Sequence, residues 1–374
     1  MKQSTKSIGI FMVFFLSIII FPIIVSAQST IDIGLITPLT GPGAMVGRDT
    51  RDGALFLFDK VNTSGGINGR KINCIVMDDK NVPTNTLNAA KKLIYQDKVF
   101  ALWTGYSPSA LAVMPLTQET ETIQIVGGVA KKIVESGHKW IIRSTPSDSL
   151  LATHYVTFAV KKLNLKKLAI LNESTDYGKG GAEDVINNIT KYNMKPLLVE
   201  SYNQGDKDFA SQLNKIKNAG ADGLFIWGLY VEGAQIIRQA KQLGLSIPIL
   251  ASSGVFQAAF LELAGKDAEG LYMETYFYLD NPAPHVQAFI KEFRTKFNYD
   301  PTAGSGIIYD GMTILLNAIK KVGVDKYKVI KEMRSSKFDG ILGKMECDDT
   351  GQCGRGALVV QVKDGKPAVV WSPD

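Results

Sequence analysis

Short apolar runs alternate with longer amphipathic segments along the chain. The first four strand-like runs are rich in Ile, Val and Leu, and they occupy 31–37, 71–77, 99–103 and 123–126. Between the first two runs, Leu57 and Val61 lie four residues apart within 47–62, as on one face of a helix. Strands that alternate with helices indicate βαβ units and parallel sheets.

The same rhythm continues through the middle of the chain and changes near its end. Further strand-like runs lie at 167–171, 197–200 and 223–227, and helices are expected to begin at Tyr177, Lys207 and Tyr230. The last third predicts helices over 284–297, 307–322 and 326–334, then strands over 357–362 and 368–371. One sheet cannot comfortably hold so many strands, so we predict two α/β lobes between which the chain crosses more than once.

The amino-terminal segment has the order of a secretory signal peptide. Lys2 and Lys6 precede an uncharged apolar stretch, 8–25, and the small residues Ser26 and Ala27 follow it. We predict a signal peptide over 1–27 that is cleaved after Ala27, and therefore an exported protein. The alternative is an uncleaved membrane anchor, because the stretch is just long enough to cross a bilayer.

Composition and charge exclude several classes of function. The 374 residues include 42 Lys and Arg against 36 Asp and Glu, which gives a net charge of +6. No basic block is interleaved with aromatic residues, so a nucleic-acid partner is not expected. With three Cys and three His, the chain has little material for a zinc or iron–sulfur site, and we expect no metal and no cofactor.

The three cysteines divide into a close pair and a single residue. Cys347 and Cys353 flank a polar turn that contains a glycine. Export would permit a disulfide here, and a metal site would need further ligands, so we predict that these two cysteines pair. Cys74 lies within a strand-like run and is predicted to be a buried free thiol.

Catalytic motifs are missing from the sequence. None of the Gly-Lys pairs is followed by the Ser or Thr of a P-loop, and no Gly-x-Gly-x-x-Gly follows the first strand. The His-Glu-x-x-His and Gly-x-Ser-x-Gly patterns are also lacking. The chain is therefore not expected to be an enzyme.

Several weak motifs, in a fixed order, resemble one known family. They are Ile-Gly-Leu-Ile-Thr-Pro-Leu-Thr-Gly-Pro at 33–42, Gly-Gly-Ile-Asn-Gly-Arg-Lys-Ile at 65–72, Asp-Tyr-Gly at 176–178, Gln-Ile-Ile-Arg-Gln-Ala at 235–240 and Asp-Pro-Thr at 300–302. The chain resembles the leucine/isoleucine/valine-type periplasmic binding proteins, the solute receptors of branched-chain amino-acid-type ABC transporters. The resemblance spans essentially all of the chain after the signal peptide.

The resemblance implies a periplasmic binding protein of type I. This is an α/β fold of two Rossmann-like lobes with parallel sheets, joined by a hinge that the chain crosses three times. Lobe 1 would comprise 28–147 and 276–356, and lobe 2 would comprise 148–275 and 357–374. A small-molecule ligand would bind in the cleft, and the closed protein, a monomer, would deliver it to the membrane permease of an ABC transporter.

The resemblance also places ligand contacts in lobe 1. A serine near a glycine holds the ligand's carboxylate in this family, and Ser107 matches it, with Tyr106 on the same wall. Ser107 also has an alternative interpretation as a helix N-cap. In the next loop the family usually has a threonine, which is absent here, so the backbone N–H groups of Gly128 and Val129 would serve. Lys131 is either a further contact for an anionic ligand or a surface residue.

Lobe 2 supplies the remaining candidates. Asp148 matches an acid that the family can use for an ammonium group, and its alternative role is a helix N-cap. Tyr177 matches an aromatic residue that packs on the ligand. Leu229 aligns with another cleft aromatic, and Tyr230 follows it directly, so either side chain could face the cleft.

Ser253 departs from the pattern of the amino-acid binders. Many of them have an acid at this position, where it pairs with the ligand's ammonium group. A buried ammonium without a carboxylate partner is costly, so the ligand could be an amino acid, an amide, or an organic or aromatic carboxylate. Val46 likewise stands where some members have an aromatic residue, and either Gly304 or Ser305 replaces a bulky one.

The main functional hypothesis is an extracytoplasmic solute-binding receptor without catalysis. One alternative is a ligand sensor with the same fold that acts on a signalling partner. A less favoured alternative is an exported enzyme that uses the same cleft.

Overall fold

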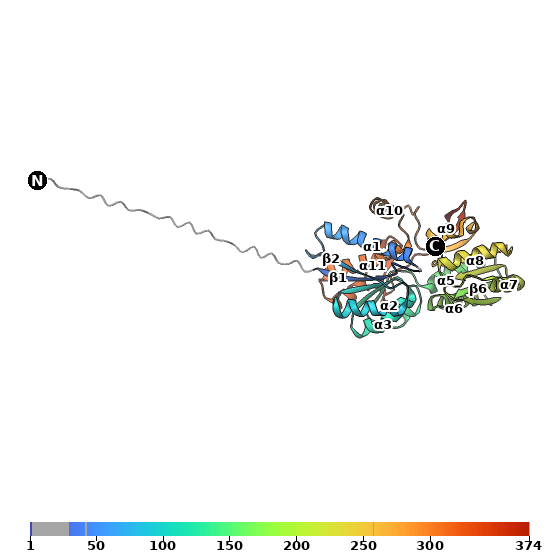
Figure 1. Ribbon diagram of the computed structural model, residues 1–374, viewed down its shortest axis with the longest axis horizontal. Helices are drawn as coiled ribbons and strands as arrows, with labels where there is room; N and C mark the ends of the chain where they lie inside the picture. The colour runs from blue at the N-terminus through green and yellow to red at the C-terminus, as the bar shows by residue number, and fades with distance from the viewer. Residues whose placement is uncertain (2–29, 42, 257, 374) are drawn as a thin grey trace.

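The computed structural model describes Met1 and residues 30–41, 43–256 and 258–373. Apart from Met1, the predicted signal peptide lies outside these residues. Two lobes lie side by side, each built of a sheet with helices on its faces (Figure 1). Within the described part of the chain, no helix has the length and apolar character needed to span a bilayer.

The first sheet is entirely parallel and has the strand order β2-β1-β3-β4-β5. Its strands are β1 (Ile31–Thr37), β2 (Ile72–Asp78), β3 (Ala101–Thr104), β4 (Ile123–Val126) and β5 (Ile141–Arg143). In the register, Leu35 lies opposite Val76 on one side and Trp103 on the other. All five strands are therefore aligned with their carboxyl ends at one edge.

The helices of this lobe come from both ends of the described chain. They are α1 (Ala44–Thr63), α2 (Pro83–Lys91) with the π-helical turn η1 (Lys92–Gln96), α3 (Ser107–Glu119), α4 (Lys132–Glu135), α10 (Pro284–Phe297), α11 (Ala303–Val322) and α12 (Lys326–Met333). A short hairpin, β11 (Lys337–Gly340) and β12 (Gly343–Glu346), follows them. Phe56 of α1 packs edge-on against Phe289 and Phe293 of α10, at ring-centroid distances of 5.7 and 5.9 Å.

The second sheet has the order β14-β13-β10-β9-β8-β6-β7. Its strands are β6 (Leu168–Glu173), β7 (Leu198–Tyr202), β8 (Gly223–Trp227), β9 (Ile249–Ala251), β10 (Tyr272–Thr275), β13 (Leu358–Lys363) and β14 (Lys366–Trp371). The five strands β6–β10 are parallel, which agrees with the predicted βαβ architecture, although β9 and β10 themselves were not predicted. β13 pairs antiparallel with β10. β13 and β14 form a hairpin whose turn residues Asp364 and Gly365 have φ of 51° and 72°, which favours antiparallel pairing at this edge.

Helices cover both faces of the second sheet. They are α5 (Asp148–Thr157) with the π-helical turn η2 (Phe158–Lys162), α6 (Asp176–Thr190), α7 (Ala210–Asn218), α8 (Tyr230–Gln242), α9 (Ala258–Ala264) and the 3-10 turn η3 (Gly265–Ala268). Trp227, at the end of the central strand β8, is completely buried in the core between the sheet and α6.

The chain passes between the two sheets three times. It does so between β5 and α5, after β10, and between the disulfide loop and β13. The predicted two-lobe α/β architecture is confirmed. The residue boundaries of the two lobes stay a prediction.

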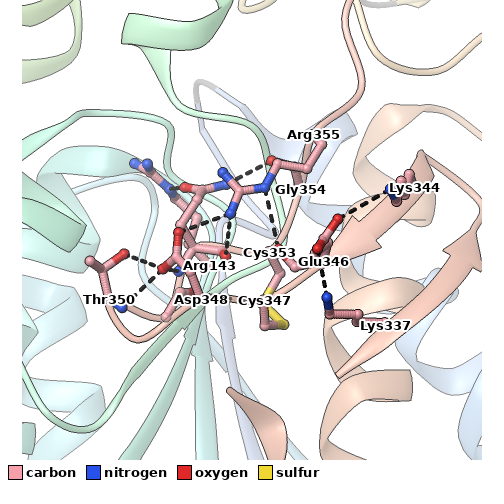
Figure 2. Close-up of polar contacts among 12 residues, drawn as sticks. Arg143, Lys337, Lys344, Glu346, Cys347, Asp348, Thr350, Cys353, Gly354 and Arg355 are labelled. Carbon is pink, nitrogen blue, oxygen red and sulfur yellow. Dashed lines mark hydrogen bonds and ion pairs between the residues drawn. A yellow bond between two sulfur atoms is a disulfide. The ribbon is translucent and has the colours of Figure 1, made fainter. Parts of the chain in front are cut away.

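A disulfide loop lies beside the first crossing (Figure 2). Cys347 and Cys353 form a disulfide with an S–S distance of 2.04 Å. The backbone N–H of Arg143 donates to the Gly351 carbonyl at 2.7 Å, and the N–H of Cys353 donates to the Arg143 carbonyl at 2.9 Å. The loop thereby extends the first sheet beyond β5. The third cysteine, Cys74, is unpaired but only half-buried, and burial raises the pKa of its thiol to about 12.

Candidate functional site

A cavity lies between the two lobes, where the carboxyl ends of the two sheets face each other. Its volume is about 1080 Å³, including open solvent at its mouth. The first sheet lines it with Thr37 and the loops after β3 and β4, and the second sheet lines it with residues after β6, β7, β8, β9 and β10. Ligands of open α/β sheets bind at this edge, because loops and helix N-termini converge there.

The lobe 1 wall is built around the start of α3. Ser107 is the first residue of α3, is 3% exposed, and its Oγ accepts a hydrogen bond from the Ala130 N–H at 3.2 Å. A β-carbon added to Gly128 would lie 2.8 Å from the Ser107 Cα, so only glycine allows the two loops to approach this closely. The structure therefore brings Tyr106, Ser107, Gly128 and Val129 to one wall of the cavity. Tyr106, rather than Ser107, occupies the N-cap position.

The lobe 2 wall is anchored by Tyr177. The Tyr177 hydroxyl donates to Ser252 Oγ at 2.9 Å and accepts from the Gly254 N–H at 3.2 Å, which fixes the ring against the cavity. Leu229 and Tyr230, at the start of α8, both line the cavity, as does Ser253. The Ser253 N–H donates to Glu274 Oε1 at 3.2 Å. Eight of the nine predicted contact residues thus lie around one space.

Asp148 is the predicted residue that the structure does not bring to the cavity. It is completely buried at the start of α5, and its N–H donates to the Val129 carbonyl at 2.9 Å. Desolvation raises the pKa of this carboxyl well above its usual value, Asp184 raises it further, and Arg143 opposes the rise. The alternative role as an N-cap belongs instead to Ser147, whose Oγ accepts from the Leu150 N–H. A ligand contact by Asp148 stays a prediction.

Several lining residues were not predicted from the sequence. Glu173 and Trp103 line the cavity with exposures of 2% and 1%, and Gln204 and Tyr276 join them. Desolvation raises the pKa of Glu173, and a hydrogen bond from Thr175 opposes the rise. The sequence placed the end of this strand at Leu171, so Glu173 fell outside the expected strand end. Val46 and Gly304, noted as smaller than in some relatives, also line the cavity.

Ion pairs connect the lobes beside the cavity. Lys131 Nζ lies 3.4 Å from Asp184 Oδ1 and 3.6 Å from Glu183 Oε2, both on α6. Lys132 Nζ lies 3.4 Å from Asp176 Oδ1 on the same helix. Lys131 is therefore directed at the opposite lobe and is not part of the cavity lining. In the part of the chain that the structure describes, no group of three or more His, Cys, Asp or Glu side chains could hold a metal ion.

Comparison with known proteins identifies the family. A family profile described as "Periplasmic binding protein" matches residues 30–367. The chain belongs to the periplasmic binding protein family. The family resemblance predicted from the sequence motifs is confirmed, and the family is one of non-enzymatic solute-binding proteins.

Relatives of this periplasmic binding protein include proteins named for binding leucine, isoleucine and valine. It is 29% identical over 331 residues to the leucine-, isoleucine-, valine-, threonine- and alanine-binding protein of Pseudomonas aeruginosa, covering 87% of each chain. The structure of the leucine-binding protein LivK from Thermotoga maritima matches with a TM-score of 0.86 and 26% identity, over 91% of this chain and 98% of that one.

A third relative has a different type of ligand. A solute-binding protein of an ABC transporter from Rhodopseudomonas palustris BisB5, solved in complex with 3,4-dihydroxybenzoic acid, matches with a TM-score of 0.83 and 25% identity. The match covers 92% of this chain and 96% of that one. The relatives therefore include both amino-acid binders and an aromatic-acid binder.

Proposed function

We propose that this periplasmic binding protein captures a small carboxylate-bearing ligand in the interlobe cavity and delivers it to the permease of an ABC transporter. It would act as a monomer in the periplasm after removal of residues 1–27. The observation that carries the proposal is the convergence of both sheets' carboxyl ends on one cavity lined from both lobes. A ligand that contacts both lobes stabilises the closed form, which is the form a permease would recognise.

The two walls suggest how the ligand is held. The first backbone N–H groups of a helix have no acceptor within the helix, so the start of α3 favours a carboxylate beside Ser107. The backbone of Gly128 and Val129 adds to this side. Tyr106, Tyr177, Leu229 and Tyr230 would pack on the apolar part of the ligand, and Ser253 would offer a small polar contact.

A ligand screen with a matched pair of serine variants tests this proposal. A panel of amino acids and organic acids is added to the purified protein, and the melting temperature is measured. A ligand present at about 100 times its Kd should stabilise the native state by about 2.7 kcal/mol. Ser107→Ala should lose most of this stabilisation, because Ser107 lines the cavity.

Ser109→Ala serves as the control for the screen. Ser109 lies in the same helical turn, but its hydroxyl bonds to Asp79 and Thr86 and does not line the cavity. This variant should keep its ligand response even if its melting temperature falls. Equal loss of binding in both variants, or turnover of the bound ligand, would contradict the proposal.

The interlobe ion pairs give a prediction about closure. Lys131→Ala should weaken ligand binding about two- to fivefold, because the closed form loses a pair worth up to about 1 kcal/mol. Lys132→Ala is the matched control, since its pair with Asp176 is more exposed, with side-chain exposures of 64% and 50% against 22% and 7% for Lys131 and Asp184. Titration calorimetry at low and high salt measures both variants. Unchanged affinity in Lys131→Ala would show that the pair does not favour closure.

A further inference from the structure

Glu173 is distinct in charge from the rest of the cavity lining. Among the described residues that line the cavity, it is the only Asp, Glu, Lys, Arg or His. It is the last residue of β6, the strand next to the edge strand β7 of the second sheet, where it lies opposite Tyr202 of β7. The strand therefore presents one carboxyl group to a cavity that has no basic side chain in its described lining.

The carboxyl group of Glu173 has unused capacity to accept hydrogen bonds. Its Oε1 accepts from the Thr175 hydroxyl at 2.6 Å, and Thr175 also lines the cavity. Its Oε2 forms no hydrogen bond of normal geometry with the described residues, although the nearby backbone of Leu229 favours the charged form of the carboxyl group. No Lys, Arg or His in that part of the chain forms an ion pair with Glu173. A carboxylate that is 2% exposed and lacks a counter-charge is costly, unless a cation or a proton comes to it.

The opposite wall of the cavity, in lobe 1, favours a negatively charged group of the ligand. The start of α3 beside Ser107 supplies N–H and hydroxyl donors, which suit an anion. A ligand that is only an anion would satisfy this wall and leave Glu173 without a counter-charge. A ligand with both a carboxylate and a cationic group would satisfy both walls.

Glu173 lies in the same part of the lobe 2 wall as Ser253 and Gly254. Gly228 connects the two places: a β-carbon added to Gly228 would lie 3.5 Å from the Glu173 Cβ. One added to Gly254 would lie 2.5 Å from the Gly228 carbonyl oxygen. Glu173 and the Ser253–Gly254 turn are therefore both neighbours of Gly228 and line the same cavity, so the lobe 2 wall carries an acid although position 253 is a serine.

We infer that Glu173 is the specificity-determining residue of the cavity, selecting ligands that carry an ammonium or similar cationic group over simple organic acids. The inference rests on the proposed function, since it requires that this cavity holds the ligand. It assigns the ligand to the amino-acid class. Glu173 would then take the role that an acid at position 253 has in many amino-acid binders. The dihydroxybenzoate-type ligand of the Rhodopseudomonas relative is then disfavoured here.

Matched ligand pairs test the inference. Leucine is compared with 4-methylpentanoate, phenylalanine with 3-phenylpropanoate, and further amino acids with their deaminated acids, by titration calorimetry on the purified protein. The wild type should bind the amino acid of a pair at least about tenfold more tightly. Glu173→Gln, which keeps an Oε1 acceptor for Thr175, should reduce that ratio about tenfold or more while still binding the deaminated acid.

Glu232→Gln is the control variant. Glu232 is also a buried acid of lobe 2, at 5% exposure, but its Oε1 accepts from the Gly205 N–H at 2.8 Å and it does not line the cavity. Its preference for the amino acid over the deaminated acid should not fall below that of the wild type, because the negative charge of Glu232 raises the pKa of Glu173 and its removal favours the charged form of Glu173. An unchanged affinity ratio within each ligand pair in Glu173→Gln, or tighter binding of the deaminated acids by the wild type, would overturn this inference. It would leave the proposed function intact. Failure of every compound to bind the wild type would instead count against the proposed function, and with it the inference.

Discussion

Replacing Gly181 with alanine is expected to destabilise the protein by about 3 kcal/mol, at the upper end of what overpacking a core usually costs. Gly181 lies in α6, and a β-carbon there would come within 1.9 Å of Nε1, 2.2 Å of Cε2 and 2.3 Å of Cδ1 of Trp227. The indole is fully buried at the end of β8, so it cannot move out into solvent without losing its packing. Urea unfolding measured by tryptophan fluorescence gives the change in free energy.

The neighbouring Gly180 provides a control, for which the expected change in stability has the opposite sign. Nothing lies within 4 Å of a β-carbon added to Gly180, which is in the same helix. Gly180→Ala should therefore raise stability by up to about 1 kcal/mol, because alanine loses less conformational entropy than glycine on entering a helix. Equal stability of Gly180→Ala and Gly181→Ala would show that α6 packs on Trp227 loosely enough to accept a methyl group.

Arg143→Met is expected to lower both stability and ligand affinity. Arg143 is completely buried at the first crossing, beside the disulfide loop (Figure 2). It also reaches the loop after β4, here called the cavity loop, which carries Gly128 and Val129. Its Nε donates to Gln352 Oε1 at 2.6 Å, and its Nη1 donates to the carbonyls of Val129 and Ala130 at 3.0 and 2.8 Å. Desolvation lowers its pKa to about 10, so it remains charged at neutral pH.

Methionine has similar bulk but no donors. The variant removes three hydrogen bonds and leaves Gln352 Oε1 without its donor, whereas the Val129 and Ala130 carbonyls still accept from the N–H groups of Asp148 and Ile133. An unsatisfied buried acceptor costs about 1–3 kcal/mol, so a net loss of about 2 kcal/mol is expected. Because the cavity loop carrying Gly128 and Val129 loses its anchor, ligand affinity should fall about tenfold or more. Urea unfolding and calorimetry measure the two effects separately.

Arg334→Met separates the structural effect from the effect on the site. Arg334 also donates to three backbone carbonyls, those of Asp349 at 2.7 Å, His138 at 3.1 Å and Lys139 at 3.0 Å, but none of these residues lines the cavity. This variant should lose stability and keep its ligand affinity. Equal affinities in the two arginine variants would mean that Arg143 does not position the cavity loop.

Much of the fold is readable from the sequence, because most strands and helices are long enough to show their period. The helix predicted over 284–297 coincides with α10, and the strand predicted over 223–227 coincides with β8. Five strands were not predicted: β5, β9, β10, β11 and β12. Of these, β5 and β9 are each three residues long and fully buried. So short an apolar run has no alternation that distinguishes a strand from a buried turn.

The site was predicted less completely than the fold, for two physical reasons. Apolar patterning ended β6 at Leu171, but its parallel ladder continues through Asn172 and Glu173, which pair with Trp227 and Tyr202. A strand prediction based on apolar residues therefore stops before polar residues at the carboxyl end of the strand. That end lies at the edge of the sheet where ligands bind. Asp148 was placed from its position in the chain, yet the first turn of α5 directs it into the protein interior, a side-chain direction that sequence position does not specify.

The packing of α11 on α1 has a consequence for how the protein is made. The first sheet is complete in sequence at β5, but α11, which packs on α1 and contributes Ile308 and Met312 to the lobe 1 core, follows every parallel strand of the second sheet. A nascent chain therefore cannot finish its first-made lobe until most of the second has emerged. Both lobes reach their native form at nearly the same stage of synthesis, and no single cut in the chain would release either lobe intact.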